Sequence, residues 1–183
     1  MTDLRPGTLL VASPVLVDPN FFRSVVVLMD HGDDGAVGVV LDRPLEMPVR
    51  EHIPDWCDHL TPPKQVFEGG PVQRETAIGV ARRPGINPSD EWHPAFDGVG
   101  FVDVAIDPDD VPGVEDARVF SGYAGWGPGQ LEMEVSIGSW FVVEGTPDDV
   151  FDPVPDTLWR RVLRREPWYI ARYANYPLDP RDN

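Results

Sequence analysis

The chain has 183 residues, of which 31 are acidic and 15 basic, and its formal charge of -16 disfavours general binding to nucleic-acid phosphates. The hydrophobic fraction of 42% is that of an ordinary globular domain, and no apolar run reaches the ~18 residues that a membrane-spanning helix needs. Because Cys57 is the only cysteine and the first residues lack the pattern of a secretory signal, we expect one cytoplasmic domain over residues 1–183, without internal disulfides or membrane contact.

In the first half of the chain, short apolar runs bounded by turn residues predict β-strands. These runs lie at 7–13, 24–29, 36–41, 65–68 and 75–81. The acidic, glycine-containing segment 30–35 joins the second run to the third, which predicts a hairpin. The proline-rich segment 44–64 indicates a connector over the core, with an irregular helix at 49–60 that is broken near Pro54.

The second half of the chain mixes strands with two helices. Further strands are expected at 101–106, 117–123 and 139–144. The segment 84–100 is rich in proline, aspartate and glycine and predicts a mobile loop. Residues 130–138 alternate apolar and polar like a strand, but Pro128 before them and Gly138 at their end favour a short helix, which we predict. Residues 156–166 predict an amphipathic helix with apolar side chains on one side and four arginines on the other.

The segment 121–132 contains four glycines, and the large aromatic residues Tyr123 and Trp126 stand between them. Such a stretch predicts a shaped loop that leads free backbone N–H groups to a helix start, where they can bind a carboxylate or a phosphate. On this hypothesis Trp126 is a wall of the site and Gln130 binds the polar group of the ligand. In the structural alternative, the glycines let backbone segments cross closely and Glu132 compensates the helix dipole.

Three blocks of the sequence carry a family resemblance. They read Gly7-Thr-Leu-Leu-Val-Ala-Ser-Pro with Asp18-Pro-Asn-Phe-Phe-Arg-Ser-Val and Gly38-Val-Val-Leu-Asp-Arg-Pro, then Gly69-Gly-Pro-Val, and finally Gly122-Tyr-Ala-Gly-Trp-Gly-Pro-Gly-Gln-Leu-Glu with Gly138-Ser-Trp. In order and spacing these blocks, which run through most of the chain, resemble the AlgH/YqgE family of small bacterial proteins.

The resemblance implies an α+β fold, with a single domain whose mixed, bifurcated sheet is partly closed into a small barrel and flanked by helices. It also implies the helix after Pro128. It implies no reaction, because the family is essentially uncharacterised and the regulatory role attached to the name AlgH does not identify a site. The chain departs from the family pattern at Asp42, where asparagine is usual before Arg-Pro, and at Ile78-Gly79-Val80, where Leu-His is usual.

The titratable and cationic residues leave several interpretations open. His31 can act as a general base with a nearby aspartate, or it can cap a turn. Arg23 and Arg43 can anchor strand ends by binding carbonyl groups, or they can bind an anion. The segment 52–59 contains histidine, cysteine and aspartate without the spacing of a zinc site, so no metal is expected. The arginines of the 156–166 helix are expected to be neutralised by acidic residues of the same chain, and contact with nucleic acid or an acidic partner is the alternative.

These observations favour a cytoplasmic binding or regulatory protein without catalytic residues or cofactor, in which a cleft beside residues 122–130 takes a small anionic or polar ligand or a protein partner. The candidate ligand-binding residues are Arg23, His31, Arg43, Gly69, Gly70, Tyr123, Trp126, Gly129 and Gln130. The first alternative is an enzyme of unknown reaction that uses His31 or Glu132. The second alternative is a transcriptional regulator that contacts DNA.

Overall fold

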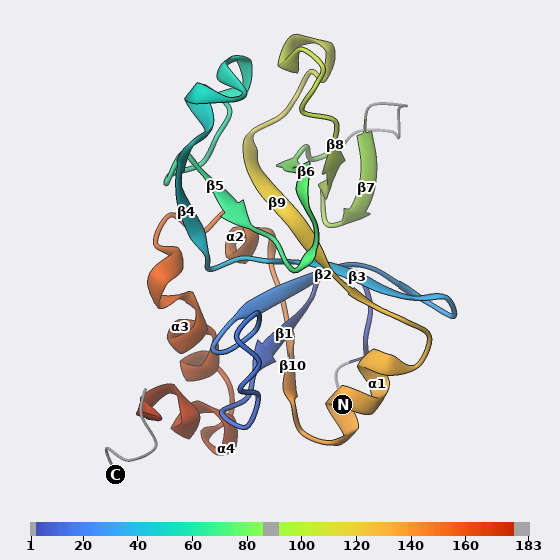
Figure 1. Ribbon diagram of the computed structural model, residues 1–183, viewed down its shortest axis with the longest axis vertical. Helices are drawn as coiled ribbons and strands as arrows, with labels where there is room; N and C mark the ends of the chain where they lie inside the picture. Colours follow the sequence, from blue (N-terminus) through green and yellow to red (C-terminus); the bar gives the residue numbers. More distant parts are fainter. Residues whose placement is uncertain (1–2, 86–91, 178–183) are drawn as a thin grey trace.

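The computed structural model describes residues 3–85 and 92–177. Its strands are β1 (Thr8–Ala12), β2 (Val25–Gly32), β3 (Gly35–Val40), β4 (Pro44–Pro48), β5 (Gln65–Glu68), β6 (Val72–Arg82), β7 (Trp92–Phe96), β8 (Val99–Val102), β9 (Asp116–Trp126) and β10 (Trp140–Glu144). They form one hydrogen-bonded sheet in the order β10-β1-β2-β3-β9-β6-β8-β7, and β5 pairs in parallel with β9 and antiparallel with β4 (Figure 1).

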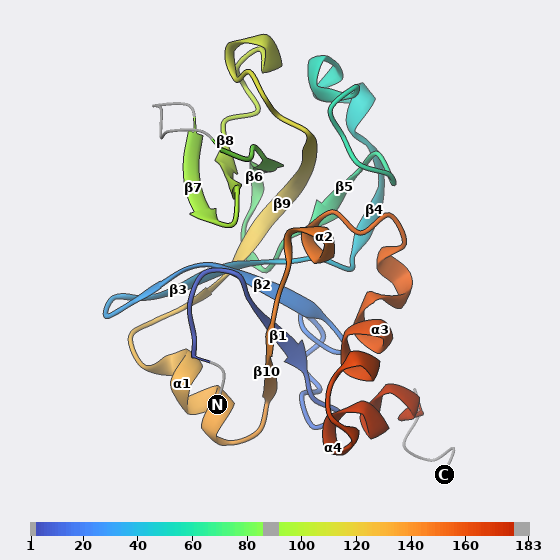
Figure 2. The same ribbon diagram turned by 180° about the vertical axis from the view of Figure 1, so that it is seen from behind.

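Helices flank this sheet. The α-helices are α1 (Gln130–Ser136), α2 (Pro147–Val150), α3 (Leu158–Arg165) and α4 (Trp168–Ala171), and the short 3-10 helices are η1 (Val49–Glu51), η2 (Pro54–Trp56), η3 (Pro108–Asp110), η4 (Pro155–Thr157) and η5 (Arg172–Asn175). Figures 1 and 2 show β1 and β10 between α1 on one side and α3 with α4 on the other. The fold is α+β, as expected, while the bifurcated sheet, its partial closure and the single domain over 1–183 stay predictions. None of the helices in the described ranges has the length and apolar character that crossing a membrane requires.

The first strands are buried on both faces, because helices cover the sheet on each side. Leu9 of β1 packs in a cluster with Trp159 of α3, whereas Leu10 packs in a second cluster with Leu131 of α1. All five residues of β1 are buried, which explains why its sequence is a continuous apolar run rather than an alternating one. The apolar side of α3 is buried as its sequence predicted.

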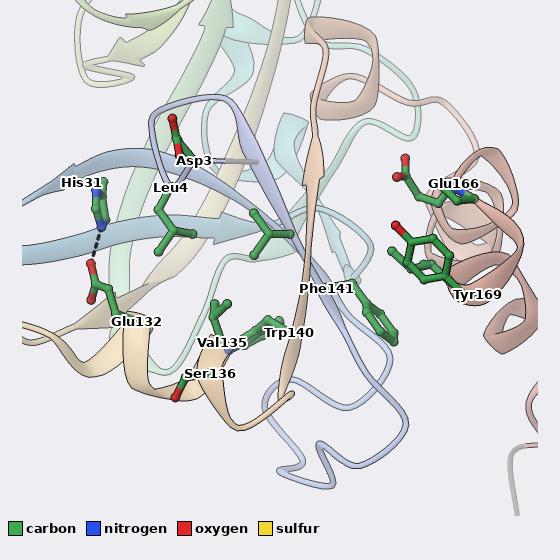
Figure 3. A pocket seen from close by; sticks show the side chains of 13 residues that line it. Asp3, Leu4, His31, Glu132, Val135, Ser136, Trp140, Phe141, Glu166 and Tyr169 are labelled. Carbon is green, nitrogen blue, oxygen red and sulfur yellow. Dashed lines mark hydrogen bonds and ion pairs between the residues drawn. The ribbon is translucent and has the colours of Figure 1, made fainter. Parts of the chain in front are cut away.

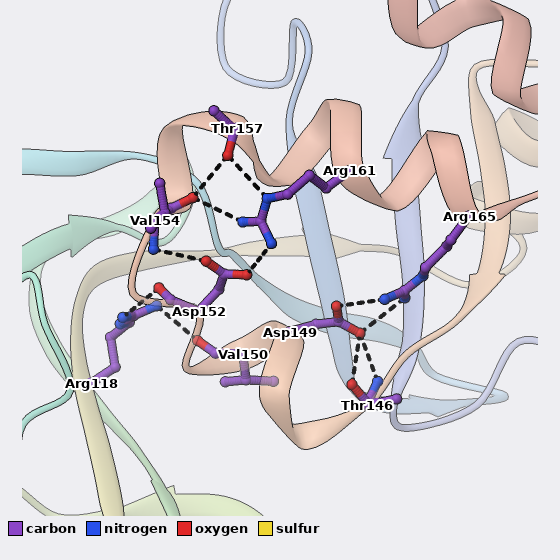
Figure 4. Close-up of polar contacts among 9 residues, drawn as sticks. All are labelled: Arg118, Thr146, Asp149, Val150, Asp152, Val154, Thr157, Arg161 and Arg165. Carbon is purple, nitrogen blue, oxygen red and sulfur yellow. Dashed lines mark hydrogen bonds and ion pairs between the residues drawn. The ribbon is translucent and has the colours of Figure 1, made fainter.

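The arginine side of α3 is partly paired within the chain. Nη1 of Arg165 lies 2.8 Å from Oδ1 of Asp149 in α2, and Arg161 pairs with Asp152 at 2.7 Å (Figure 4). Behind them, the buried Arg118 of β9 donates a hydrogen bond to the carbonyl oxygen of Asp152 at 3.0 Å. Two of the four arginines on this helix are therefore neutralised by acidic residues of the same chain, as the composition indicated.

The long strand β9 connects the two parts of the sheet. Its N-terminal half pairs with β6, and its C-terminal end pairs with β3. Between these parts, the backbone at Gly69 and Gly70 crosses β9 closely, since a Cβ atom at either position would lie 2.2 Å from backbone atoms of Gly122 or Tyr123. Only glycine fits at this crossing. On the β9 side, a Cβ atom at Gly122 would lie 2.7 Å from the carbonyl oxygen of Gly70, which is the close crossing that the structural alternative expected for the glycines of 121–132.

The helix predicted over 130–138 is confirmed as α1, so the alternating pattern there does not form a strand. Gly129 before it has a φ of 71° and Gly138 after it a φ of 82°, both in the left-handed region that favours glycine. The loop expected over 121–132 is shorter than predicted, because β9 continues to Trp126 and its backbone groups are used in pairing with β3. The turn is limited to residues 127–129.

The hairpin between the second and third strands is confirmed, but its loop is shorter than the predicted 30–35 segment. β2 continues to Gly32, which pairs with Gly35, so Asp33 and Asp34 alone form the turn. A β-bulge after Leu28 shifts the register of the pair. His31 therefore lies on a strand and is not a loop residue.

The prediction of a mobile loop at 84–100 is wrong from residue 92 onward, where β7 and β8 form a hairpin. Residues 86–91 lie outside the described residues. The side chain of Trp92 is 1% exposed and packs in the core, an apolar contact that anchors the hairpin and that composition alone did not reveal. The strand predicted at 101–106 correspondingly begins at Val99 and ends at Val102.

Candidate ligand-binding groove

A groove of about 930 Å³ runs from α1 across the edge of β10 to α4 (Figure 3). Apolar side chains form much of its lining, among them Leu4, Val135, Trp140, Val142 and Ile170. Three carboxylates also line it, from Asp3, Glu132 and Glu166. Val142 packs on the α1 side of the sheet and Phe141 on the α3 side, so the groove reaches both faces by passing over the last strand of the sheet order.

His31 and Glu132 form a hydrogen-bonded pair at the α1 end of the groove. Nε2 of His31 lies 2.7 Å from Oε1 of Glu132, with the histidine side chain 20% exposed and the glutamate 50% exposed. Hydrogen bonds from its own backbone N–H and from His31 lower the pKa of Glu132. The sequence named these residues as separate candidates, and the structure brings them together by packing the β2–β3 hairpin beside α1.

Behind the groove, the carboxylate of Glu134 holds the aromatic side chains beside α1. Its Oε2 accepts hydrogen bonds from the indole Nε1 atoms of Trp126 and Trp140, both at 2.9 Å, and its Oε1 accepts one from Gln130 at 3.0 Å. The ring of Phe21 lies 5.4 Å from that of Trp140 and 6.1 Å from that of Trp126, between centroids. Trp126 and Gln130 therefore position α1, and of this network Trp140 lines the groove.

The turn before α1 uses its polar groups internally. Oε1 of Gln130 accepts a hydrogen bond from the backbone N–H of Gly127 at 3.0 Å, and Gln130 N donates to Gly127 O at 3.1 Å. Two of the backbone N–H groups at this helix start, those of Gly127 and Gln130, are therefore already bonded within the chain, as the structural alternative expected.

Arg23 and Arg43 both bind backbone carbonyl groups away from the groove. Arg23 donates to the carbonyl oxygens of Tyr176 and Pro177, the latter at 2.6 Å, and its guanidinium lies 4.8 Å from the ring of Trp159. Arg43 donates to three carbonyl oxygens of the 19–22 turn, at 2.5 to 3.0 Å. The two arginines thus fix chain segments to the sheet, which is the anchoring geometry that their position at strand ends suggested.

Of the predicted ligand-binding residues, His31 alone lines the groove. Gly69, Gly70 and Tyr123 lie at the crossing with β9, and Gly129 lies in the turn before α1. Their part in binding a ligand stays a prediction.

A second, smaller cavity of about 380 Å³ lies between η1 and the β6–β9 pair, lined by residues that include His52, Thr76 and Phe120. Across residues 3–85 and 92–177, no three histidine, cysteine, aspartate or glutamate side chains gather in a way that could hold a metal ion.

A family model described as AlgH-like matches residues 9–170. The chain belongs to the AlgH-like family. The UPF0301 protein SCO2948 of Streptomyces coelicolor is 48% identical over 179 residues, which cover 95% of this chain and 93% of the relative. A UPF0301 protein of Mycobacterium marinum is 42% identical over 181 residues, covering 96% of this chain and 90% of the relative.

Two solved structures resemble the AlgH-like chain over nearly its whole length. The crystal structure of protein DIP2367 from Corynebacterium diphtheriae has a TM-score of 0.89 and 31% identity, and the match covers 96% of this chain and 94% of that one. The solution structure of the AlgH protein from Pseudomonas aeruginosa has a TM-score of 0.68 and 26% identity, with 98% of this chain and 100% of that one covered.

Asp42, where the sequence was expected to depart from the family pattern, lies away from the groove of this AlgH-like chain. Its Oδ1 accepts a hydrogen bond from the backbone N–H of Val25 at 3.1 Å. Burial raises the pKa of the Asp42 carboxyl to about 7, against the opposing effects of that hydrogen bond and of the charge of Arg43. Asp42 is therefore a titratable group beside the start of β2, and it takes no part in the groove.

Most of the groove was missed by sequence reasoning. Trp140 belongs to the third block of the family resemblance, and this was the one feature of the sequence that pointed to a residue of the groove other than His31 and Glu132. Tyr169 and Ile170 follow Pro167 in the short helix α4, which no periodic pattern in the sequence predicted. Tyr169 is 54% exposed. The groove exists because residues from the two ends of the chain, Leu4 on one side of β10 and Tyr169 with Ile170 on the other, line the same space.

Proposed function

We propose that the protein is a cytoplasmic binding or regulatory protein whose ligand lies in the groove formed by α1, β10 and α4. The groove itself is the observation that carries the proposal. Its volume of about 930 Å³ is in the range of ligand pockets, roughly 300–1,000 Å³. Its lining combines many apolar side chains with a few polar groups, the composition that lets a site bury a ligand and also select it.

The lining favours a ligand with an apolar body and a cationic or hydrogen-bond-donating group. Asp3, Glu132 and Glu166 contribute carboxylates, and His31 is the one basic side chain among the described residues of the lining. The sequence led us to expect a small anionic or polar ligand. The proposal keeps a polar ligand but gives it a positive rather than a negative charge. The same carboxylates, together with the formal charge of -16, argue against DNA as the ligand.

Acid–base catalysis is the second candidate, because the His31–Glu132 distance of 2.7 Å suits a proton-transferring pair. Binding is preferred because the hydroxyl of Ser136, which also lines the groove, donates to the backbone oxygen of Met133 at 2.7 Å. The described part of the groove lining contains neither cysteine nor lysine, so no activated nucleophile accompanies the pair.

The proposal is tested by thermal unfolding of the purified protein against a library of metabolites and short peptides. The variant Ser136→Trp places a large ring in the groove from the exposed side of α1. Met133→Trp is the matched control, since Met133 is on the same helix, is 55% exposed and does not line the groove. A ligand at a hundred times its Kd adds about 2.7 kcal/mol, which raises Tm by roughly 5–10 °C in a domain of this size.

We expect this rise in the wild type and in Met133→Trp, and its loss in Ser136→Trp. A rise of the same size in Ser136→Trp would place the ligand elsewhere and contradict the proposal. Turnover of a library compound that is abolished by His31→Ala would establish the enzyme instead.

A further inference from the structure

β10 is an edge strand whose second side faces the groove. It pairs with β1 alone, in antiparallel register from Thr8↔Glu144 to Ala12↔Trp140. In the described ranges, no other strand pairs with it. An edge strand presents a row of backbone N–H and C=O groups that can pair with another chain. The groove therefore contains main-chain groups as well as side chains.

The ladder with β1 shows which backbone groups point toward the groove. In an antiparallel pair, residues that face the partner alternate with residues that face away from it. Ser13 N donates to Ser139 O at 2.9 Å, so every second residue counted from Ser139 faces β1. The N–H and C=O groups of Trp140, Val142 and Glu144 consequently point away from β1.

One contact supports this assignment and marks where the open edge ends. The carbonyl oxygen of Glu144 accepts a hydrogen bond from Nη2 of Arg165 at 3.0 Å, on the side away from β1. Trp140 and Val142 have no such partner among residues 3–85 and 92–177, so two N–H and two C=O groups remain for a ligand. Such a row binds an extended peptide through main-chain hydrogen bonds.

We propose that the ligand of this groove is an extended peptide segment with basic side chains, which pairs with β10 as an additional strand. The inference rests on the proposed function, because it names the class of ligand for the same groove. The side chains of an added strand alternate between the two faces of the sheet. On one face they meet Leu4 and Val135, and on the other they meet Tyr169 and Ile170, so both faces offer apolar contacts.

The charges of the groove select basic side chains in such a peptide. Neither Asp3 nor Glu166 forms an ion pair with another described residue, and the half-exposed carboxylate of Glu132 pairs with His31 alone. The formal charge of -16 attracts a cationic segment at long range and speeds its encounter with the groove.

A second copy of the chain is a poorer occupant of the same edge. Figure 3 shows β10 between Val135 of α1 and Tyr169 of α4, so a second copy would have to bring its own helices past these side chains to pair its β10 there. Two chains of formal charge -16 also repel each other. A flexible peptide enters the groove without either penalty.

The test uses ¹⁵N-labelled protein and a library of octapeptides built from Val, Ile, Tyr, Lys and Arg. A peptide that binds is expected to slow hydrogen exchange of the Trp140 and Val142 amides about tenfold or more, while the Phe141 amide, which already faces β1, changes little. N-methylation of a peptide amide that faces β10 should weaken binding about tenfold, whereas N-methylation of its neighbour, which faces away, should change it less than about threefold. Replacement of the basic residues by glutamate should abolish binding.

A protein variant provides an independent check. Val142→Pro removes an outward N–H that takes no part in the β1 ladder, and proline is tolerated at such edge positions. The variant is expected to lose about tenfold in peptide affinity. If it does not fold, the N-methylated peptides decide the question on the unaltered protein.

The inference is overturned if no octapeptide protects the Trp140 and Val142 amides, or if the two N-methylated forms bind equally well. In either case the proposed function survives when another compound stabilises the wild type and Met133→Trp but not Ser136→Trp. The proposed function fails, whatever the outcome for peptides, when every ligand that stabilises the wild type stabilises Ser136→Trp equally.

Discussion

Replacement of Asp42 by asparagine should stabilise the protein at neutral and alkaline pH. Folding raises the pKa of the Asp42 carboxyl from 3.8 to about 7, chiefly because the carboxyl of this partly buried residue loses contact with water. Between these two pH values the folded state binds a proton that the unfolded state has released. The free energy of unfolding therefore falls as the pH rises through this window, and the loss is complete above pH 7.

The size of the effect follows from the two pKa values. A rise from 3.8 to about 7 corresponds to a loss of up to about 4 kcal/mol at pH 8, about 1.5 kcal/mol at pH 5 and almost none at pH 3. An asparagine side chain can accept the same hydrogen bond from Val25 N, now 3.1 Å long, without carrying a charge. Asp42→Asn should therefore gain up to about 4 kcal/mol over the wild type at pH 8, and about 2.5 kcal/mol less at pH 5.

Urea unfolding followed by tryptophan fluorescence measures the free energies of unfolding of the wild type and of Asp42→Asn at pH 5 and pH 8. Asp110→Asn is the matched control, because Asp110 is exposed and its substitution removes a charge without relieving burial. The control should show no gain that grows with pH. The reasoning is refuted if Asp42→Asn is no more stable than the wild type at pH 8, or if its gain does not increase between pH 5 and pH 8.

Three further substitutions test other parts of the structure by urea unfolding. Glu134→Ala leaves two indole N–H groups without their acceptor and should lower the free energy of unfolding by about 2–4 kcal/mol, whereas Glu134→Gln, which keeps an acceptor, should lose less than half of that. Gly70→Ala places a Cβ 2.2 Å from the backbone of β9 and should lower the free energy of unfolding by more than about 3 kcal/mol. At Gly129 an added Cβ meets no atom within 4 Å, so Gly129→Ala should lower it by about 1–2 kcal/mol, through the left-handed backbone alone. Similar losses in the two variants would contradict the close crossing at Gly70. Glu132→Gln should cost less than about 1 kcal/mol at pH 7, because the contact between His31 and Glu132 is half exposed. In the wild type this small contribution should be lost as the pH falls through the lowered pKa of Glu132 and the carboxylate is protonated. A loss above about 2 kcal/mol would show a structural role instead.

Local signals in the sequence predicted the elements that depend on local chemistry. Pro128 and Gly138 bracketed α1 correctly against an alternating pattern, because helix ends are set by backbone constraints that a single residue imposes. The apolar runs of β1 and β2 predicted strands, and the opposed apolar and arginine sides predicted α3.

The groove could not be predicted in the same way. It depends on which strand lies at the edge of the sheet, and the pairing of β1 with β10 joins residues more than a hundred positions apart. The sequence singled out Glu132 but not Glu134, although both are on α1, because their different partners are decided by the direction in which each side chain points. The glycines of 121–132 suggested a loop beyond the strand predicted at 117–123, whereas β9 continues to Trp126 and Gly122 lies at the close crossing with Gly70.

The most direct measurement of the central claim is a ¹⁵N chemical-shift map of the protein with a ligand that raises its Tm. The account predicts that the largest shifts belong to residues of α1, β10 and α4, with Val135, Val142 and Ile170 among them. Shifts that gather instead around His52 and Thr76, in the smaller cavity of about 380 Å³, would contradict it.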